Sequence, residues 1–228
     1  MEHSDSGAPP PVAAVEPPAV EREPDGVQDI FGVRTELARQ FTADLAQYGE
    51  LLGLIGPLEL PRLWSRHILN SAVVAPYLRV GARVADVGSG AGLPGLVLAI
   101  TQPDARLVLI EPMERRCDWL RAEADRLGLT NVEVVRARAE DAGDHGPFDQ
   151  VTARAVSALR TLIPITAPLV RRGGEVILLK GARVEAEIAS AAKQIARYRL
   201  RSVEVLVLGE GVVPEVTRLF RATVDAAS

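Results

Sequence analysis

The chain has 228 residues with 47% hydrophobic content and a net charge of −4, which is enough to enclose the core of one α/β domain with modest extensions. No apolar run approaches the roughly 20 residues of a membrane span, the N-terminus lacks the basic-then-apolar pattern of a secretion signal, and the lone Cys117 excludes an intramolecular disulfide. Composition therefore predicts a cytoplasmic protein without a structural metal, since no Cys/His cluster has metal-ligand spacing.

Residues 1–26 are rich in proline and in acidic side chains. This segment carries six prolines and a net charge of −5, so the remaining residues sum to +1. A segment of this composition cannot bury enough apolar surface to offset the entropy of ordering it, and we predict a disordered tail. The near-neutral remainder neither favours nor excludes a nucleic-acid partner. The excess of arginine over lysine fits planar contacts with phosphates and bases or a genomic bias equally well.

Residues 27–78 predict a helical cap that precedes an α/β core. Apolar side chains recur at three- or four-residue spacing from Val33 to Tyr48, the pattern of a helix with one buried face. A break is expected at 53–57, where two glycines and a proline interrupt the pattern. Residues 59–77 then predict a further helix.

From Gly81 onward, strand-like and helix-like segments alternate, which predicts a parallel sheet wrapped by helical crossovers. The predicted strands are 83–87, 106–110, 132–136, 148–153, 175–180, 202–208 and 218–224, and the predicted helices include 115–127, 158–169 and 185–198. The last two strands are too close in sequence for a helical crossover, so they are expected to pair antiparallel. Seven strands with an antiparallel final hairpin match the Rossmann-like architecture of class I S-adenosylmethionine (SAM) methyltransferases, over residues 79–228.

The glycine-rich segment 86–95 (D-V-G-S-G-A-G-L-P-G) follows a predicted buried strand and precedes a helix. Glycine at such a turn lets bare backbone approach a ligand at the helix N-terminus. A dinucleotide fingerprint requires G-x-G-x-x-G; Gly88 and Gly90 fit it, whereas Leu93 occupies the third position. This departure weakens the alternative of an NAD-dependent dehydrogenase. The spacing D-x-G-x-G-x-G is typical of the first motif of class I SAM methyltransferases.

Acidic residues lie where the first three predicted strands end, and ligands of open α/β sheets bind outside these carboxyl ends. Glu111 follows the second strand, where a carboxylate can accept hydrogen bonds from both ribose hydroxyls of a nucleoside. Asp86 either supports the glycine turn or orients the ammonium group of SAM. Ala139 and Glu140 lie past the third strand, where this class receives adenine, although Glu140 equally fits a cap of a short helix.

The fourth predicted strand ends at Arg154, within T-A-R-A (152–155). Amino-group methyltransferases carry Asn/Asp-Pro-Pro-aromatic here, and cytosine-C5 enzymes need a nearby cysteine; the chain has neither. Guanine N7 requires neither device, because it has an in-plane lone pair and no proton to lose, so orientation and electrostatics suffice. We therefore predict that Arg138, Arg154 or Lys180 holds guanine O6 or the flanking phosphates.

His67, in the segment W-S-R-H (64–67), is the remaining candidate for chemistry. It either faces the target base or phosphate, or it is a buried histidine with satisfied hydrogen bonds. Trp64 and Trp119 are predicted to belong to the core. The predicted catalytic residues are Arg138, Arg154, Lys180 and His67, and the predicted cofactor-binding residues are Asp86, Gly88, Gly90, Leu93, Glu111, Ala139, Glu140 and Arg154.

Together these segments resemble the RsmG (GidB) family of 16S rRNA guanine-N7 methyltransferases. The resemblance runs from about residue 60 to 180 and rests on W-S-R-H-I-L-N-S (64–71), the glycine turn, R-A-E (138–140), T-A-R-A and L-K-G (179–181). Asn70 stands where the family often has Asp. The resemblance implies SAM as cofactor and 16S rRNA or the 30S subunit as partner. It also implies methyl transfer to N7 of one guanine in the decoding-region loop, with SAM contacts at Gly88, Leu93, Ala139, Glu140 and Arg154.

Two other classes of function remain open from the residues themselves. One is a SAM-dependent methyltransferase that acts on a protein or a small molecule, since base-free chemistry at sulfur or at a deprotonated oxygen suits the same fourth strand. The other is a SAM-binding RNA factor without catalysis, which the intact glycine turn and the strand-end carboxylate disfavour, because both serve a cofactor. Nothing in the chain demands more than a monomer.

Overall fold

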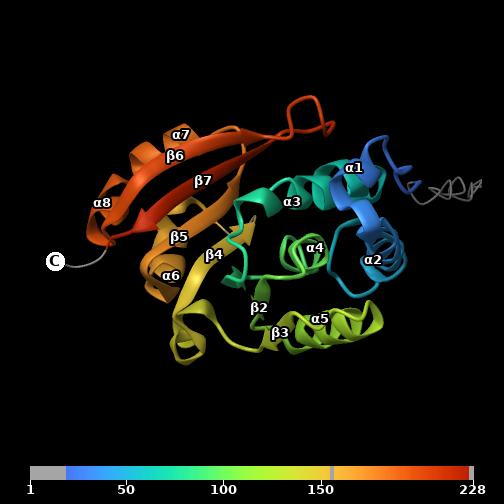
Figure 1. Cartoon of the computed structure of the whole chain (residues 1–228), viewed down its shortest axis with the longest axis horizontal. Helices are drawn as coiled ribbons and strands as arrows, with labels where there is room; N and C mark the ends of the chain where they lie inside the picture. Colours follow the sequence, from blue (N-terminus) through green and yellow to red (C-terminus); the bar gives the residue numbers. More distant parts are fainter. Residues whose placement is uncertain (1–18, 155–156, 226–228) are drawn as a thin grey trace, which may run out of the picture.

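The computed structural model describes residues 19–154 and 157–225, which form a seven-stranded sheet with helices on both faces (Figure 1). The strand order is β3-β2-β1-β4-β5-β7-β6. β7 pairs antiparallel with both β5 and β6, and the other neighbours pair in parallel. The predicted class I architecture, with its antiparallel final hairpin, is confirmed.

The observed strands follow the predicted ones closely. They are β1 (Arg83–Val87), β2 (Arg106–Ile110), β3 (Val132–Val135), β4 (Phe148–Arg154), β5 (Val170–Lys180), β6 (Leu200–Leu208) and β7 (Thr217–Val224). β5 begins earlier than predicted, because Val170 pairs with Phe148 before a register shift and Arg171 forms an ion pair with Asp149. Such pairing across strands is invisible in the local pattern of residues 170–174.

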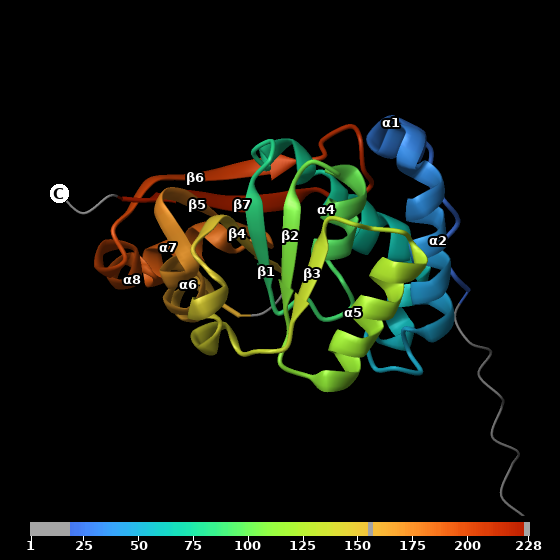
Figure 2. The same ribbon diagram turned by 60° about the horizontal axis from the view of Figure 1, so that its bottom comes forward.

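Two helical layers enclose the sheet (Figure 2). One layer contains α4 (Gly95–Thr101), α5 (Glu114–Arg126) and the N-terminal cap; the other contains α6 (Leu159–Thr166), α7 (Val184–Ser190) and α8 (Ala192–Arg197). Neighbouring residues of one strand face opposite layers. Leu107 and Leu109 of β2 join the core cluster of the first layer, whereas Val108 joins that of the second. Burial on both faces explains why the parallel strands are almost continuously apolar.

The cap is more broken than the sequence predicted. It consists of α1 (Val27–Phe31), η1 (Gly32–Arg34), α2 (Thr35–Tyr48), η2 (Pro57–Arg62), η3 (Leu63–Leu69), α3 (Asn70–Ala72) and η4 (Ala75–Tyr77). The predicted single helix over 59–77 is wrong. Pro61 and Pro76 lack the N–H that a continuous α-helix needs and fall within 3₁₀ segments. Between them η3 is a π-helix, a form that occurs frequently at functional sites.

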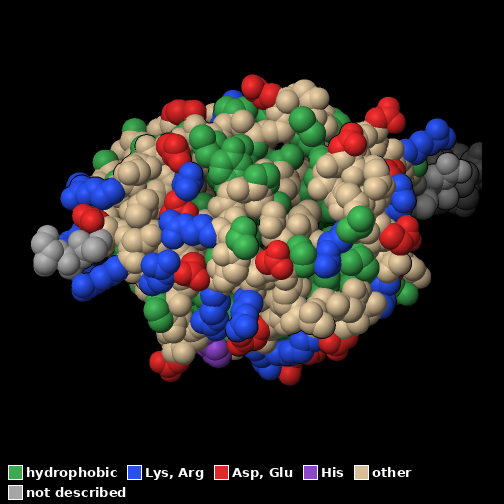
Figure 3. Space-filling model, in the orientation of Figure 1, with side chains coloured by type: hydrophobic (Ala, Val, Ile, Leu, Met, Phe, Trp, Pro, Cys, Tyr) green, Lys and Arg blue, Asp and Glu red, His purple; other side chains and the backbone are tan. Residues whose placement is uncertain are grey.

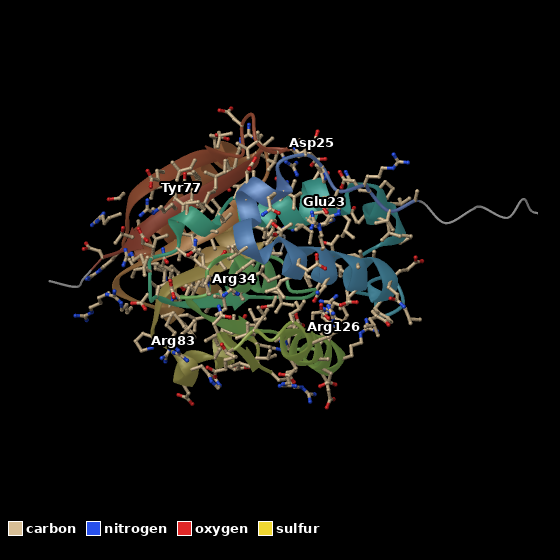
Figure 4. The ribbon with its side chains drawn as sticks, turned by 45° about the vertical axis from the view of Figure 1, so that its right-hand side comes forward. Glu23, Asp25, Arg34, Tyr77, Arg83 and Arg126 are labelled. Carbon is tan, nitrogen blue, oxygen red and sulfur yellow. The ribbon has the colours of Figure 1, made fainter. Side chains whose placement is uncertain are left out.

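The cap shares a hydrophobic core with the α/β part of the molecule. Phe41, Leu45 and Leu69 of the cap belong to the same buried cluster as Leu96 and Leu98 of α4. An ion pair between Asp44 of α2 and Arg126 of α5 closes the outer side of this contact, and Arg126 points toward α2 in Figure 4. The division of the chain near residue 79 therefore stays a prediction based on sequence.

The predicted disordered tail is wrong for its last residues. Glu21 donates its backbone N–H to the Leu60 carbonyl oxygen at 2.9 Å and accepts the Ser65 N–H through its carboxylate, also at 2.9 Å. Glu23, labelled in Figure 4 beside the cap helices, accepts two hydrogen bonds from Arg39 at 2.7 and 2.8 Å. The acidic side chains thus find fixed donors on the cap, which composition does not reveal. Residues 1–18 lie outside the described residues.

Leu69→Ala should lower the free energy of unfolding by about 2–5 kcal/mol, because it removes a fully buried side chain from the cluster that cap and sheet share. Chemical denaturation followed by tryptophan fluorescence and circular dichroism measures the change. Leu58→Ala is the matched control, since this leucine is 78% exposed and its loss should shift stability by less than about 0.5 kcal/mol. Two separate transitions, of which Leu69→Ala moves one, would contradict a shared core.

Candidate functional site

The carboxyl ends of β1, β2 and β4 lie side by side, because β1 pairs in parallel with both neighbours. Asp86 is in register with Leu109 on one side and with Thr152 on the other. The glycine turn after β1, Glu111 after β2 and Arg154 at the end of β4 therefore meet at one edge of the sheet. This is the edge at which open α/β sheets bind ligands.

The glycine turn after β1 leaves its backbone bare. Gly88, Gly90 and Gly92 have φ values of 72°, 54° and 96°, in the left-handed region that L side chains rarely adopt. The Gly88 N–H donates to the Ile110 carbonyl oxygen at 2.9 Å, which ties the turn to β2. A Cβ at Gly90 would meet only the Gly88 carbonyl oxygen, at 3.7 Å. The space above Gly90 is thus open to a ligand.

Asp86 is fully buried beneath this turn. Its Oδ2 accepts the Gly95 N–H at 3.0 Å, at the start of α4, whereas its Oδ1 has no partner. Burial raises the pKa of Asp86 to about 7, even though the hydrogen bonds around it favour the carboxylate. One oxygen therefore supports the turn, and the other remains available to a donor or a cation.

Glu111 is buried and locked by two backbone groups. Its Oε2 accepts the Gly90 N–H at 3.0 Å and its Oε1 accepts the Met113 N–H at 3.0 Å. Arg116 of α5 approaches the carboxylate at 4.0 Å. Each carboxylate oxygen has two lone pairs, so both can still accept hydroxyl hydrogen bonds. The geometry suits a carboxylate held in place for two neighbouring hydroxyl groups.

The other predicted cofactor residues flank this turn. Leu93 is buried in the core cluster of the cap layer, and Ala139 begins the short helix η5 (Ala139–Asp141) after β3. Glu140 is exposed in the first turn of η5. Trp119, predicted to be a core residue, is buried and donates its indole N–H to the Ala91 carbonyl oxygen at 3.0 Å. It thereby fastens α5 to the glycine turn.

Arg154 points into the cap rather than into solvent. Its Nη1 donates to the His67 carbonyl oxygen and to the Ser71 hydroxyl oxygen, both at 3.2 Å, and its Nη2 donates to the Arg66 carbonyl oxygen at 3.1 Å. Burial lowers the pKa of Arg154 to about 10, which leaves it charged at neutral pH. A charged group at the end of β4 thus depends on the cap for its position.

His67 is held between Arg154 and a carboxylate. Its Nδ1 lies 2.6 Å from Nη2 of Arg154, and its Nε2 lies 2.7 Å from Oε2 of Glu59. Because an arginine can only donate, Nδ1 must accept and Nε2 must carry the hydrogen that Glu59 receives. Burial, followed by the charge of Arg154, lowers the pKa of His67 to about 4. His67 is therefore a neutral, buried histidine with both nitrogens satisfied.

The predicted catalytic residues do not all come together. Arg154, His67 and Lys180 lie around the ends of β4 and β5, whereas Arg138 follows β3, from which β4 is separated by β2 and β1. Lys180 is nearly buried, forms an ion pair with Glu187 at 2.7 Å and donates to the Ser157 carbonyl oxygen at 2.8 Å. Its charge is therefore already compensated within the protein.

A cavity of about 280 Å³ opens beside Arg154, on the side away from the glycine turn. Its lining comes from the cap, from the ends of β4 and β5, and from the loop before β7: Arg66, Asn70, Arg154, Leu179, Lys180, Gly181, Glu215, Val216 and Thr217. Sequence reasoning missed Glu59 and Glu215, and it gave no role to Ser71 although this residue ends the motif W-S-R-H-I-L-N-S. Glu59 and Glu215 carry no motif of their own, and their roles depend on contacts that the fold creates.

The described part of the chain contains neither a membrane-spanning helix nor a cluster of metal ligands. Within residues 19–154 and 157–225 no helix has both the length and the apolar character needed to cross a membrane. Over the same ranges, no group of three or more His, Cys, Asp or Glu side chains is arranged to hold a metal ion.

Comparison with known proteins points in one direction. The family model GidB, described as rRNA small subunit methyltransferase G, matches residues 34–215. The chain is 65% identical to the Ribosomal RNA small subunit methyltransferase G of Leifsonia xyli subsp. xyli, over 90% of this chain and 98% of that protein. It is 58% identical to the protein of the same name from Clavibacter michiganensis, over 92% and 99%. A solved SAM-dependent methyltransferase from Aquifex aeolicus shares the fold, with a TM-score of 0.55 at 17% identity over 76% of this chain and 98% of that one.

Gly95→Ala should destabilise the protein by about 1–3 kcal/mol and weaken ligand binding at the glycine turn. A Cβ at this position would lie 2.3 Å from Cδ2 of Leu109 and 2.6 Å from Oδ2 of Asp86. Urea denaturation and isothermal titration with SAM measure the two effects. Gly143→Ala is the control, since a Cβ there has nothing within 4 Å. Equal stability of the two variants would contradict the crowding at Gly95.

His67→Gln should flatten the fall in stability between pH 7 and about pH 5. The pKa of His67 drops from the ordinary 6.5 to about 4 on folding. Between these two values the unfolded chain binds a proton that the folded protein does not. The free energy of unfolding therefore decreases as the pH is lowered through this range. The wild type should lose about 2 kcal/mol more than the variant over this range.

Denaturation at a series of pH values gives the difference between wild type and His67→Gln. Asp86 and Glu123, whose pKa values are both raised to about 7, titrate in both proteins and cancel in that difference. Parallel pH curves would mean that His67 is not held in the neutral form.

Proposed function

The chain belongs to the GidB family of small-subunit rRNA methyltransferases, and on this basis we propose that it transfers a methyl group from SAM to N7 of a guanine in 16S rRNA. The observation that carries the proposal is the composition of the sheet edge. A complete cofactor turn lies beside a β4 end that carries an arginine instead of a base or a nucleophile.

The residues at the glycine turn fit SAM. Glu111 offers a fixed carboxylate for ribose hydroxyls, Gly88 and Gly90 leave the backbone bare, and Oδ1 of Asp86 is a buried acceptor without a partner. When bound, SAM supplies an electrophilic methyl group on a sulfonium. We assign the remaining contacts to Leu93, Ala139, Glu140 and Arg154, with adenine near η5. A cation close to Asp86 would favour its charged form and lower its raised pKa.

The end of β4 favours an acceptor that needs no deprotonation. Cys117, the sole cysteine in the sequence, is buried, and its thiol lies 3.1 Å from the carbonyl oxygen of Glu111, which follows β2, not β4. His67 is neutral, but both of its nitrogens are already bound to Glu59 and Arg154. Guanine N7 has a lone pair and no proton, so the task of the protein is to orient the base and exclude water. Arg154 then acts as a fixed charge beside the reacting groups.

Charge alone does not direct this protein to RNA. On the face shown in Figure 3, Lys and Arg side chains are interspersed with Asp and Glu rather than gathered into one basic field. Excluding residues 1–26, the chain has a net charge of +1. A nearly neutral chain attracts the RNA backbone only weakly. We therefore propose that the protein recognises the folded shape of the rRNA or of the 30S subunit. We further propose a cytoplasmic, monomeric enzyme that uses no metal.

The proposed activity predicts one methyl group per 16S rRNA, at N7 of a guanine, when the protein is incubated with methyl-labelled SAM and 30S subunits from a strain that lacks this gene. Strand scission at 7-methylguanine after borohydride and aniline treatment locates the product. Arg154→Ala should still bind SAM through the glycine turn and Glu111, and it should reduce the rate by roughly 10²-fold, since it removes the side chain that holds the cap in place beside the reacting groups.

Arg160→Ala is the control for that experiment, because Arg160 is exposed on α6. Label that appears in protein or in small molecules but not in RNA would overturn the proposed acceptor. An Arg154→Ala protein that methylates at the wild-type rate would overturn the role of Arg154.

A further inference from the structure

The sheet edge is divided into two halves that meet at Arg154. The cofactor half, which contains the glycine turn, Glu111 and η5, lies over β1, β2 and β3. The other half is the cavity beside Arg154, which lies over β4, β5 and the start of β7. Arg154 lines this cavity and ends β4, which pairs with β1 where Thr152 is in register with Asp86, so it is close to both halves. A base that presents one edge to the cofactor half would therefore occupy this cavity.

Several polar groups of the cavity already form ion pairs or hydrogen bonds within the protein. Lys180 is bound to Glu187 and to the Ser157 carbonyl oxygen, and Arg154 donates to four acceptors of the cap. These residues supply charge and shape, and most of their N–H groups already donate within the protein. They leave the recognition of the base to other groups.

Glu215, in the loop before β7, differs from these residues because its carboxylate has an ion-pair contact beyond hydrogen-bond distance. Its side chain is 44% exposed, and its Oε2 lies 3.7 Å from Nη1 of Arg66, too far for a hydrogen bond. Asn70 also lines the cavity, but its Oδ1 is buried without a partner and is not exposed to a ligand. The cavity lining therefore includes a carboxylate that can accept two hydrogen bonds from a ligand.

A carboxylate distinguishes guanine from the other bases. Guanine presents N1–H and N2–H₂ as adjacent donors, and two carboxylate oxygens can accept both at once. Adenine presents an acceptor at N1, which a carboxylate repels. These donors lie on the six-membered ring, on the far side of the base from N7. A base with N7 toward the cofactor half would thus turn its donor edge toward the β7 side of the cavity.

We propose that Glu215 is the specificity-determining residue for the acceptor base and that it accepts hydrogen bonds from N1–H and N2–H₂ of the target guanine. Arg66 holds the carboxylate on the cavity wall through their ion pair, and it is itself fixed by a second contact to Glu59 at 3.5 Å. The proposal rests on the proposed function, which it deepens by naming the residue that selects guanine.

The test compares guanine with inosine at the methylated position of a ligated rRNA assembled into 30S subunits. Inosine keeps O6, N1–H and N7 and lacks only the 2-amino group. Single-turnover methylation by the wild type should be roughly 10- to 100-fold slower on inosine, since a charged acceptor then loses a hydrogen bond. Glu215→Gln should be slow on guanine by a similar factor and should discriminate less than about threefold between the two bases.

Matched measurements separate recognition from folding. Glu210→Gln, in the same β6–β7 loop but outside the cavity, should retain both the wild-type rate and the wild-type discrimination. The thermal midpoint and the Kd for SAM of Glu215→Gln should equal those of the wild type, because the residue lies in an exposed loop away from the cofactor half. Glu215→Asp, which keeps the carboxylate, should restore part of the discrimination.

The outcomes that overturn the proposal are distinct from failure of the proposed function. If the wild type methylates guanine and Glu215→Gln still discriminates guanine from inosine as the wild type does, Glu215 does not select the base and only this proposal fails. If the wild type methylates no guanine in the RNA, the proposed function fails together with it.

Discussion

Two buried carboxylates control the geometry of the site. Asp86 holds the first N–H of α4, and Glu111 holds the N–H groups of Gly90 and Met113, so the glycine turn is fixed from below and from the side. Burying a charge is costly unless it is hydrogen-bonded, and these backbone donors supply the bonds. The turn in turn fixes where bare backbone faces a ligand, and every other functional residue is placed relative to it.

The cap is a structural part of the active site. Its π-helical segment presents backbone carbonyls and the ring of His67 to Arg154, while Glu59 orients that ring from the other side. An arginine at the end of β4 would be costly to bury without these acceptors. The common hydrophobic core of cap and sheet makes this arrangement rigid, since neither part can move without exposing apolar surface.

Methyl transfer to guanine N7 requires no base and no nucleophile from the protein, but it requires the guanine to be oriented accurately. The cofactor half of the sheet edge provides carboxylates and bare backbone, the other half provides a cavity, and Arg154 lies between them. With no proton to remove, the rate depends on how well the base is oriented and on how its surroundings are charged. The carboxylate of Glu215 in the cavity lining is the part of this geometry that distinguishes one base from another.

The sequence by itself determined where the strands lie and that they run parallel except for an antiparallel final hairpin. It also determined the glycine turn and the acidic strand ends. These features follow from hydrophobic periodicity and glycine spacing, which are local properties. Only the tertiary structure decided the rest. The cap is divided into 3₁₀ and π segments, with Pro61 and Pro76 in the 3₁₀ segments. Glu21 and Glu23 accept hydrogen bonds from donors on the cap. His67 is a neutral histidine that bridges two side chains and not a free base. Glu215 acquired its place in the same way. Hydrogen bonds and burial between residues far apart in the chain depend on packing, and no local pattern records them.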